Sequence, residues 1–243
     1  KRNIGCPLPV KEGVGRSAAQ IEYSKKGWVE RLDAQWGYFD IAPEDGRIVV
    51  IETVRDKLGV PHYQYFANQT QSQVYEPWSS SKVMAITGAL SHMRAKGGIG
   101  ATASAGDVPV ADLITSVHSY EPEGAADGNS NAIATYFANL ATRGYLTSLF
   151  HDKWLKLDDP GIYFSGAYAN VVFTPSDLNW HQAGNVVAAP YYEKASDDPN
   201  YQSYRCDKCG LTGNKPMTTL AQAEWLKRLS MHEPEPVTSH PNL

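Results

Sequence analysis

The stretch Glu76-Pro77-Trp78-Ser79-Ser80-Ser81-Lys82-Val83-Met84-Ala85 opens a long apolar segment near the middle of the chain. Ser79 precedes Lys82 by three residues, where a helical pattern begins. The pattern predicts a helix over residues 79–95 that ends at Gly97-Gly98. Because residues i and i+3 lie on the same face of a helix, the Ser79 hydroxyl and the Lys82 amine are expected to share a hydrogen bond.

This spacing suits nucleophilic chemistry. A serine hydroxyl needs a proton acceptor before it becomes an effective nucleophile, and a desolvated lysine beside other polar groups can serve as one. Ser79 would also lie at the positive end of the helix dipole, which stabilises a developing oxyanion. The alternative is structural: Ser79, Ser80 and Ser81 form a serine run that caps an amphipathic helix.

The sequence before this motif predicts one helix and two or three strands. Apolar residues recur at helical spacing from Ser17 to Trp36, and Gly37 is expected to end that helix. Alternating and β-branched residues predict strands, with a turn between the first two, at residues 38–42, 47–53 and 63–66. Residues 1–16 are interpreted as an irregular lead-in.

The sequence after the motif predicts mainly helices and one long loop-rich region. The expected helices cover residues 110–116, 131–141, 144–157 and 218–231, and the loop-rich region covers residues 158–216. The last helix is expected to bury a stripe formed by Leu220, Trp225, Leu226 and Leu229.

A helix, a hairpin and then Ser-x-x-Lys at the start of a buried helix resemble the penicillin-recognising serine hydrolases, which include class A β-lactamases and D-alanyl-D-alanine peptidases. Residues 77–82 look like that family's Pro-x-Ser-x-x-Lys, and residues 108–116 and 214–229 are similar to two of its later helices. The resemblance covers roughly residues 17–155 and 214–231. It implies an α/β fold in which helices flank an antiparallel sheet, with an all-helical subdomain, in one domain over residues 17–243.

The family's second motif, Ser-x-Asn or Tyr-x-Asn, is altered here. The register that keeps the helix start gives Asn129-Ser130-Asn131, and sliding back by two residues gives Asp127-Gly128-Asn129. The resemblance implies that Asn129 and Asn131 position the substrate. Ser130 would relay a proton only if the backbone turned its hydroxyl inward. The alternative is a polar loop that caps the next helix.

The family's third motif, a Lys-Thr-Gly strand after the late helix, is not found in the sequence. Lys208-Cys209-Gly210 precedes that helix and is discounted. The resemblance implies sheet strands beyond Leu243, so we expect a companion C-terminal polypeptide, separated by cleavage, that carries a Lys-Thr-Gly-like strand.

Taken together, these patterns imply a serine hydrolase that forms an acyl-enzyme on Ser79, with Lys82 as proton acceptor. Its substrate would be a small molecule or peptide with an amide or ester bond, such as a β-lactam or a peptidoglycan stem peptide. The resemblance implies no metal and no organic cofactor. The alternative is a non-catalytic or slowly acylated relative that acts as a sensor or binding protein.

The composition of the chain excludes several classes of protein. The chain has 243 residues, 42% of them hydrophobic, and a formal net charge of −4, which excludes a disordered protein. Its basic residues are scattered, which argues against nucleic-acid binding, and no apolar run is long enough to span a bilayer. Many aromatic residues with few cysteines are compatible with a secreted or periplasmic protein. Cys206 and Cys209 are expected to form a local disulfide or to remain free thiols rather than to bind zinc.

Overall fold

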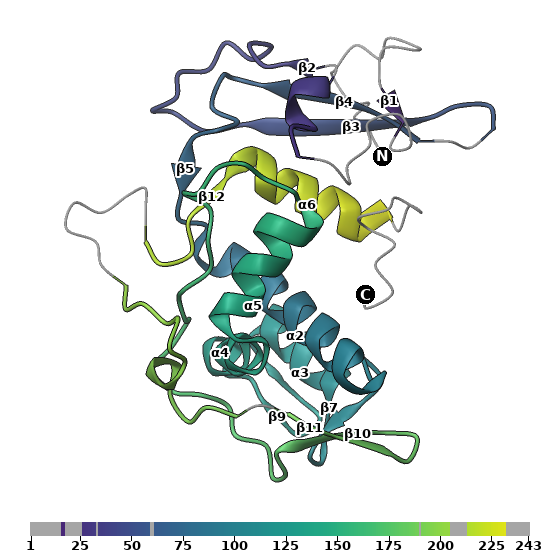
Figure 1. The fold of residues 1–243 in the computed structure, drawn as a ribbon, viewed down its shortest axis with the longest axis vertical. Helices are drawn as coiled ribbons and strands as arrows, with labels where there is room; N and C mark the ends of the chain where they lie inside the picture. The colour runs from purple at the N-terminus through teal and green to yellow at the C-terminus, as the bar shows by residue number, and fades with distance from the viewer. Residues whose placement is uncertain are drawn as a thin grey trace. The chain divides into compact units, whose positions relative to one another are not determined.

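The computed structural model describes residues 16–17, 26–32, 34–58, 61–189, 191–204 and 213–231 (Figure 1). These residues divide into two units. The first unit contains the described residues up to Gln73 together with the last helix, and the second contains Val74–Thr218. The mixed α/β class expected from the sequence is confirmed. Cys206 and Cys209 lie outside the described residues.

The first unit is built around a four-stranded sheet, and the two longest strands of this sheet pair with each other along their whole length. Its strands are β1 (Arg16–Ser17), β2 (Ala34–Gln35), β3 (Val49–Arg55) and β4 (Pro61–Ala67). Strand β4 pairs antiparallel with β1 and β3 and parallel with β2, so the expectation of an entirely antiparallel sheet is wrong at β2. All four strands precede Ser79, and two of them, β3 and β4, correspond to strands predicted from the sequence.

The helix predicted up to Trp36 is wrong over its described part. The structure instead has a short 3₁₀ helix, η1 (Val29–Arg31), followed by β2. The interruption lies at Gly27, whose φ of 72° is left-handed and therefore incompatible with a continuing α-helix. Trp28, next along the chain, is fully buried, which explains why an apolar pattern is present without a long helix.

The strand predicted over residues 38–42 is also absent, because an asparagine side chain organises this segment. The amide nitrogen of Asn68 donates to the carbonyl oxygens of Ile41 (3.0 Å) and Gly46 (2.8 Å). Its amide oxygen accepts from the backbone nitrogen of Ile48 at 3.1 Å. These bonds replace the strand ladder with a loop. The two strands predicted after this segment, over residues 47–53 and 63–66, are confirmed as β3 and β4, with boundaries shifted by about two residues.

Helix α6 (Thr219–Met231) lies along one face of the sheet in the first unit (Figure 1). Leu220 and Trp225 are buried as predicted, but Leu226 is exposed and the charged Glu224, Lys227 and Arg228 are buried instead. Glu224 forms ion pairs with both cations and accepts a hydrogen bond of 2.8 Å from the phenol of Tyr65. A satisfied polar cluster therefore occupies part of the face that the apolar pattern assigned to leucines.

The second unit is mainly helical. Its helices are η2 (Trp78–Ser81), α2 (Lys82–Gly97), α3 (Val110–Ser119), α4 (Ser130–Ala141), α5 (Arg143–Thr147), the π-helical η3 (Ser148–Trp154) and the short η4 (Ala195–Asp197). Helix α4 is buried along almost its whole length and packs against α2 and α3. A side chain at Gly88 of α2 would overlap Leu146, so this glycine permits close packing of α2 on α5.

Short strand pairs connect the helices of the second unit. They are β6 (Ser104–Ala105) with β7 (Val108–Pro109), β8 (Pro122–Glu123) with β9 (Ala126–Asp127), β10 (Asn179–Gln182) with β11 (Asn185–Ala188), and β5 (Val74–Tyr75) with β12 (Met217–Thr218). The described residues of the region predicted to be loop-rich, 158–189, 191–204 and 213–216, are irregular apart from β10, β11 and η4. No helix within the described ranges has both the length and the apolar character needed to cross a membrane.

Candidate active site

Ser79 lies in a strained turn at the start of the helical segment. The preceding residue, Trp78, has a φ of 50°, a left-handed backbone conformation that is rare for a bulky side chain. Such a conformation costs roughly 1–3 kcal/mol and persists only when the surrounding structure imposes it. Backbone strain of this kind is concentrated at functional sites. It therefore supports a functional role for Ser79 on grounds that are independent of the sequence motif.

The three consecutive serines make different hydrogen bonds. Ser80 donates to the carbonyl oxygen of Pro77 at 2.6 Å, and Ser81 donates to that of Trp78 at 2.7 Å. The Ser79 hydroxyl instead lies beside the phenol of Tyr120 and helps to lower the pKa of that phenol. Within the described residues Lys82 donates to Ser130 and Tyr120 rather than to Ser79, so the expected hydrogen bond between Ser79 and Lys82 is wrong. The alternative in which the serine run caps α2 is not supported, because the N-cap residue Ser81 makes no side-chain capping bond.

Lys82 is buried with only 4% of its surface exposed, and its amine hydrogen-bonds two hydroxyl-bearing residues. The amine nitrogen Nζ donates to Ser130 Oγ at 2.9 Å and to Tyr120 Oη at 3.4 Å. It also lies 4.7 Å from the centre of the Tyr120 ring. Lys82, Tyr120 and Ser130 thus form one hydrogen-bonded group with Ser79 beside it, and these four residues are called the Lys82 cluster below.

Tyr120 is the member of this cluster that the sequence did not predict. It follows α3 in a left-handed conformation with φ 62°, which turns the chain and presents the phenol to Lys82. The hydrogen bond from Lys82 and the charge of that amine, followed by bonds with Ser79 and Ser130, lower the pKa of Tyr120. A signal was available, because Tyr120 is a hydroxyl residue 38 positions after Lys82; it was missed because it ends a helix rather than beginning one.

The residues of the altered second motif separate into three roles. Asn129 caps α4 by accepting a hydrogen bond of 3.1 Å from the backbone nitrogen of Ala132. Ser130 is turned inward and buried; it accepts from Lys82 and donates to the carbonyl oxygen of Val117 at 2.6 Å. Asn131 is exposed and lines a cavity. The structure therefore brings Ser130 to the cluster and Asn131 to the cavity, while Asn129 stabilises the helix start.

A cavity of about 550 Å³ opens beside Ser79. This volume lies in the range of sites that hold small molecules. Its lining combines aromatic rings, amides and one lysine: Trp78, Ser79, Asn131, Ala167, Tyr168, Ala169, Asn170, Tyr201, Ser203, Tyr204, Asn214 and Lys215.

Lys215 contributes a buried cation to this cavity wall, and it too was not predicted. Its amine lies 3.2 Å from a carboxylate oxygen of Glu76 and donates to Asn214 Oδ1 at 2.9 Å and to the carbonyl oxygen of Ala167 at 3.2 Å. Burial lowers the pKa of Lys215, and the charge of Glu76 opposes that shift. The amine is therefore hydrogen-bonded to Asn214 and Ala167, and its charge is balanced by the buried carboxylate of Glu76.

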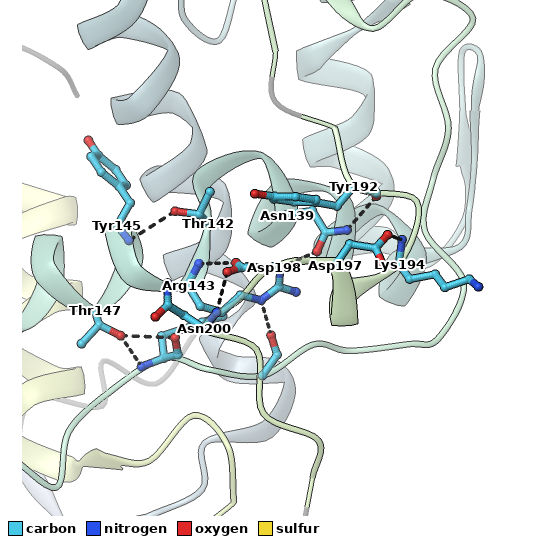
Figure 2. Close-up of polar contacts among 12 residues, drawn as sticks. Asn139, Thr142, Arg143, Tyr145, Thr147, Tyr192, Lys194, Asp197, Asp198 and Asn200 are labelled. Atoms are coloured by element: carbon cyan, nitrogen blue, oxygen red, sulfur yellow. Dashed lines mark hydrogen bonds and ion pairs between the residues drawn. The ribbon is translucent and has the colours of Figure 1, made fainter.

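A second buried charge, Arg143, holds the loops that line the cavity (Figure 2). Its Nε donates to the carbonyl oxygen of Gly166 at 3.0 Å, and its Nη1 contacts Asp198 at 3.4 Å. Asp198 also accepts 2.7 Å from the backbone nitrogen of Arg143, and the guanidinium lies over the ring of Tyr201. Burial lowers the pKa of Arg143, against the opposing effect of Asp198. One side chain thereby links the loop at residue 166 to the loop at residues 198–201.

Comparison of this chain with protein-family models, with curated proteins and with solved structures gives no significant match. The candidate site therefore rests on the geometry described above.

Proposed function

We propose that this chain is a serine hydrolase that forms an acyl-enzyme on Ser79, on a fold related to the β-lactamases and D-alanyl-D-alanine peptidases. The observation that carries the proposal is the Lys82 cluster, in which a buried amine hydrogen-bonds two hydroxyl groups beside the candidate nucleophile, at the edge of a cavity. An isolated serine at a helix start would not need these neighbours.

In the proposed reaction, Ser79 Oγ attacks the carbonyl carbon of an amide or ester. Its proton passes to the Lys82–Tyr120 pair, for which the lowered pKa of Tyr120 favours an acceptor role. The leaving group departs with a proton supplied by the same pair, and water then hydrolyses the acyl-serine bond. Asn131, at the cavity wall, would orient the substrate. The candidate substrates are β-lactams, peptidoglycan stem peptides and related amides or esters. The protein would act as a secreted or periplasmic enzyme.

One observation favours the alternative of a slowly acylated sensor or binding protein. Ser130 already donates its hydrogen to the carbonyl oxygen of Val117, so its hydroxyl is not poised to protonate a leaving group. Such a protein would bind and become acylated at Ser79 without rapid turnover.

Time-resolved intact mass spectrometry with a fluorescent penicillin and a fluorophosphonate distinguishes these functions. A hydrolase gives a penicilloyl adduct that disappears as product accumulates, and a binding protein gives an adduct that persists. Absence of any adduct with both reagents, in a protein that is folded by circular dichroism, would show that Ser79 is not an activated nucleophile. The matched control is Ser79→Ala, which should remain unlabelled.

A further inference from the structure

The wall of the cavity beside Ser79 contains an exposed pair of aromatic rings. The rings of Trp78 and Tyr204 lie 5.0 Å apart between centres at an interplanar angle of 43°. Trp78 is 55% exposed and Tyr204 is 37% exposed, although large apolar side chains are usually covered in folded proteins. We refer to this pair as the aromatic platform.

The backbone of Trp78 has a left-handed conformation, and its ring packs against Tyr204. Its left-handed conformation is adjacent to Ser79, so the ring and the nucleophile belong to the same strained turn. On the other side of the platform, Gly213 passes close to Tyr204: a side-chain carbon at Gly213 would lie 2.5 Å from the Tyr204 ring. The platform is therefore positioned before a ligand arrives.

The charge of the cavity is internally balanced. Lys215 is the cation in the lining, and its amine already contacts the Glu76 carboxylate, the Asn214 amide and the Ala167 carbonyl. An anionic ligand group would have to displace one of these acceptors to reach it. The exposed amides of Asn131 and Asn170 instead offer neutral donors and acceptors to a ligand.

We propose that this cavity selects a neutral acyl group that carries an aromatic ring, which stacks on the platform of Trp78 and Tyr204. The inference rests on the proposed function and names the substrate class of the same site. Transfer of such a group forms the bond from Ser79 Oγ to the acyl carbon and breaks the ester bond. The alcohol leaves with the proton that Ser79 gave up.

Three p-nitrophenyl esters with the same leaving group test this proposal: the phenylacetate, the acetate and the negatively charged hemisuccinate. Acylation rates at Ser79 are measured from the nitrophenolate burst and intact mass, each divided by the rate of the same ester with imidazole. Because an aromatic pair and its buried area together favour the ring, we expect the phenylacetyl rate to exceed both others about tenfold. Equal rates, or a faster hemisuccinate, would overturn the proposal.

Variants of the platform assign the preference to its residues. Trp78→Ala and Tyr204→Leu should each reduce the ratio of the phenylacetyl to the acetyl rate, and Trp78→Phe should restore most of it. Leu178→Ala, an exposed apolar residue outside the cavity lining, should keep the wild-type ratio. An unchanged ratio in both platform variants would contradict the assignment.

Failure of the proposed function gives a different result, namely no acylation of Ser79 by any of the three esters. The ring preference is then measured by calorimetric binding of phenylacetamide, acetamide and succinamate. Tighter binding of phenylacetamide than of either other amide, weakened in Trp78→Ala, supports the platform. Equal binding of all three would overturn it.

Discussion

At the scale of single residues, the site depends on which acceptor each hydroxyl has. Ser80 and Ser81 give their hydrogens to backbone carbonyl oxygens three residues earlier, so these hydroxyls help to close the turn. Ser79 lies beside the phenol of Tyr120, which itself accepts a hydrogen bond from the buried amine of Lys82. Identical side chains in consecutive positions thus have different surroundings, and Ser79 is the one beside the phenol that Lys82 contacts.

Tyr120→Phe tests the proton acceptor. Since the pKa of Tyr120 lies below its ordinary value of about 10, the acylation rate of the wild type should rise with pH as this phenol loses its proton. The variant should lose that limb of the pH profile and fall in rate by about 10²-fold or more. Tyr191→Phe, a phenol that bonds Thr174 outside the cavity lining, is the matched control. An unaltered pH profile in Tyr120→Phe would assign the acceptor role to another group.

At the scale of elements, two residues at the start of α4 have different roles: one stabilises the helix and the other faces the cavity. Asn129 and Asn131 are the same residue type two positions apart, yet the first caps the helix and the second faces the cavity. This division follows from the helix itself, because the N-cap side chain turns back to the first backbone nitrogens while the next turn projects outward.

Paired variants test this separation. Asn129→Ala should lower the free energy of unfolding by about 1 kcal/mol, the usual cost of losing an N-cap, as measured by urea denaturation. Asn131→Ala should leave that stability within about 0.5 kcal/mol, because its side chain is exposed, and should instead raise KM. The reverse pattern would show that the two roles have been exchanged.

The elements also show how far the sequence alone could be used. The helices α2, α3, α4 and α6 were predicted within a few residues, since helical periodicity and glycine ends are local signals. The segment before β2 was predicted as a helix, but Gly27 has a left-handed backbone that a continuous helix through this segment cannot contain. The buried charges of α6 were also missed, since their partners on β4 are distant in sequence.

Prediction of the candidate site from the sequence has the same limit: it succeeds where the signal is local and fails where contacts join distant residues. Ser79 and Lys82 are three residues apart and were predicted from their spacing, and Ser130 was predicted only conditionally. Tyr120, Lys215 and Arg143 were not predicted, because each acts through contacts between separate loops. The contact from the Lys215 backbone to Glu76, for example, joins residues 139 positions apart.

At the scale of the whole molecule, the described chain places the entire candidate site within the unit formed by Val74–Thr218. In the cavity wall, Trp78 and Ser79 lie in η2 and Asn131 lies in α4, but the other lining residues come from irregular segments. Such segments need anchors, and Arg143 supplies one by joining Gly166, Asn139 and Asp198 through buried hydrogen bonds (Figure 2). The integrity of the cavity is therefore tied to the stability of this unit.

Arg143→Met tests that link. Removing the guanidinium leaves the buried Asp198 carboxylate without its ionic partner, so we expect the free energy of unfolding to fall by about 3 kcal/mol. Urea denaturation measures the change, and the exposed Arg94, replaced in the same way, is the control. A loss below about 1 kcal/mol would show that the loops are held by other contacts.

The identity of the nucleophile is tested most directly by locating a covalent adduct. The protein is treated with a fluorophosphonate, digested, and sequenced by tandem mass spectrometry across the three serines. We predict that the adduct lies on Ser79, that Ser79→Ala is unlabelled while its melting temperature is nearly unchanged, and that Lys82→Met slows labelling. An adduct on Ser80 or Ser81, or equal labelling of wild type and Ser79→Ala, would contradict the proposed mechanism.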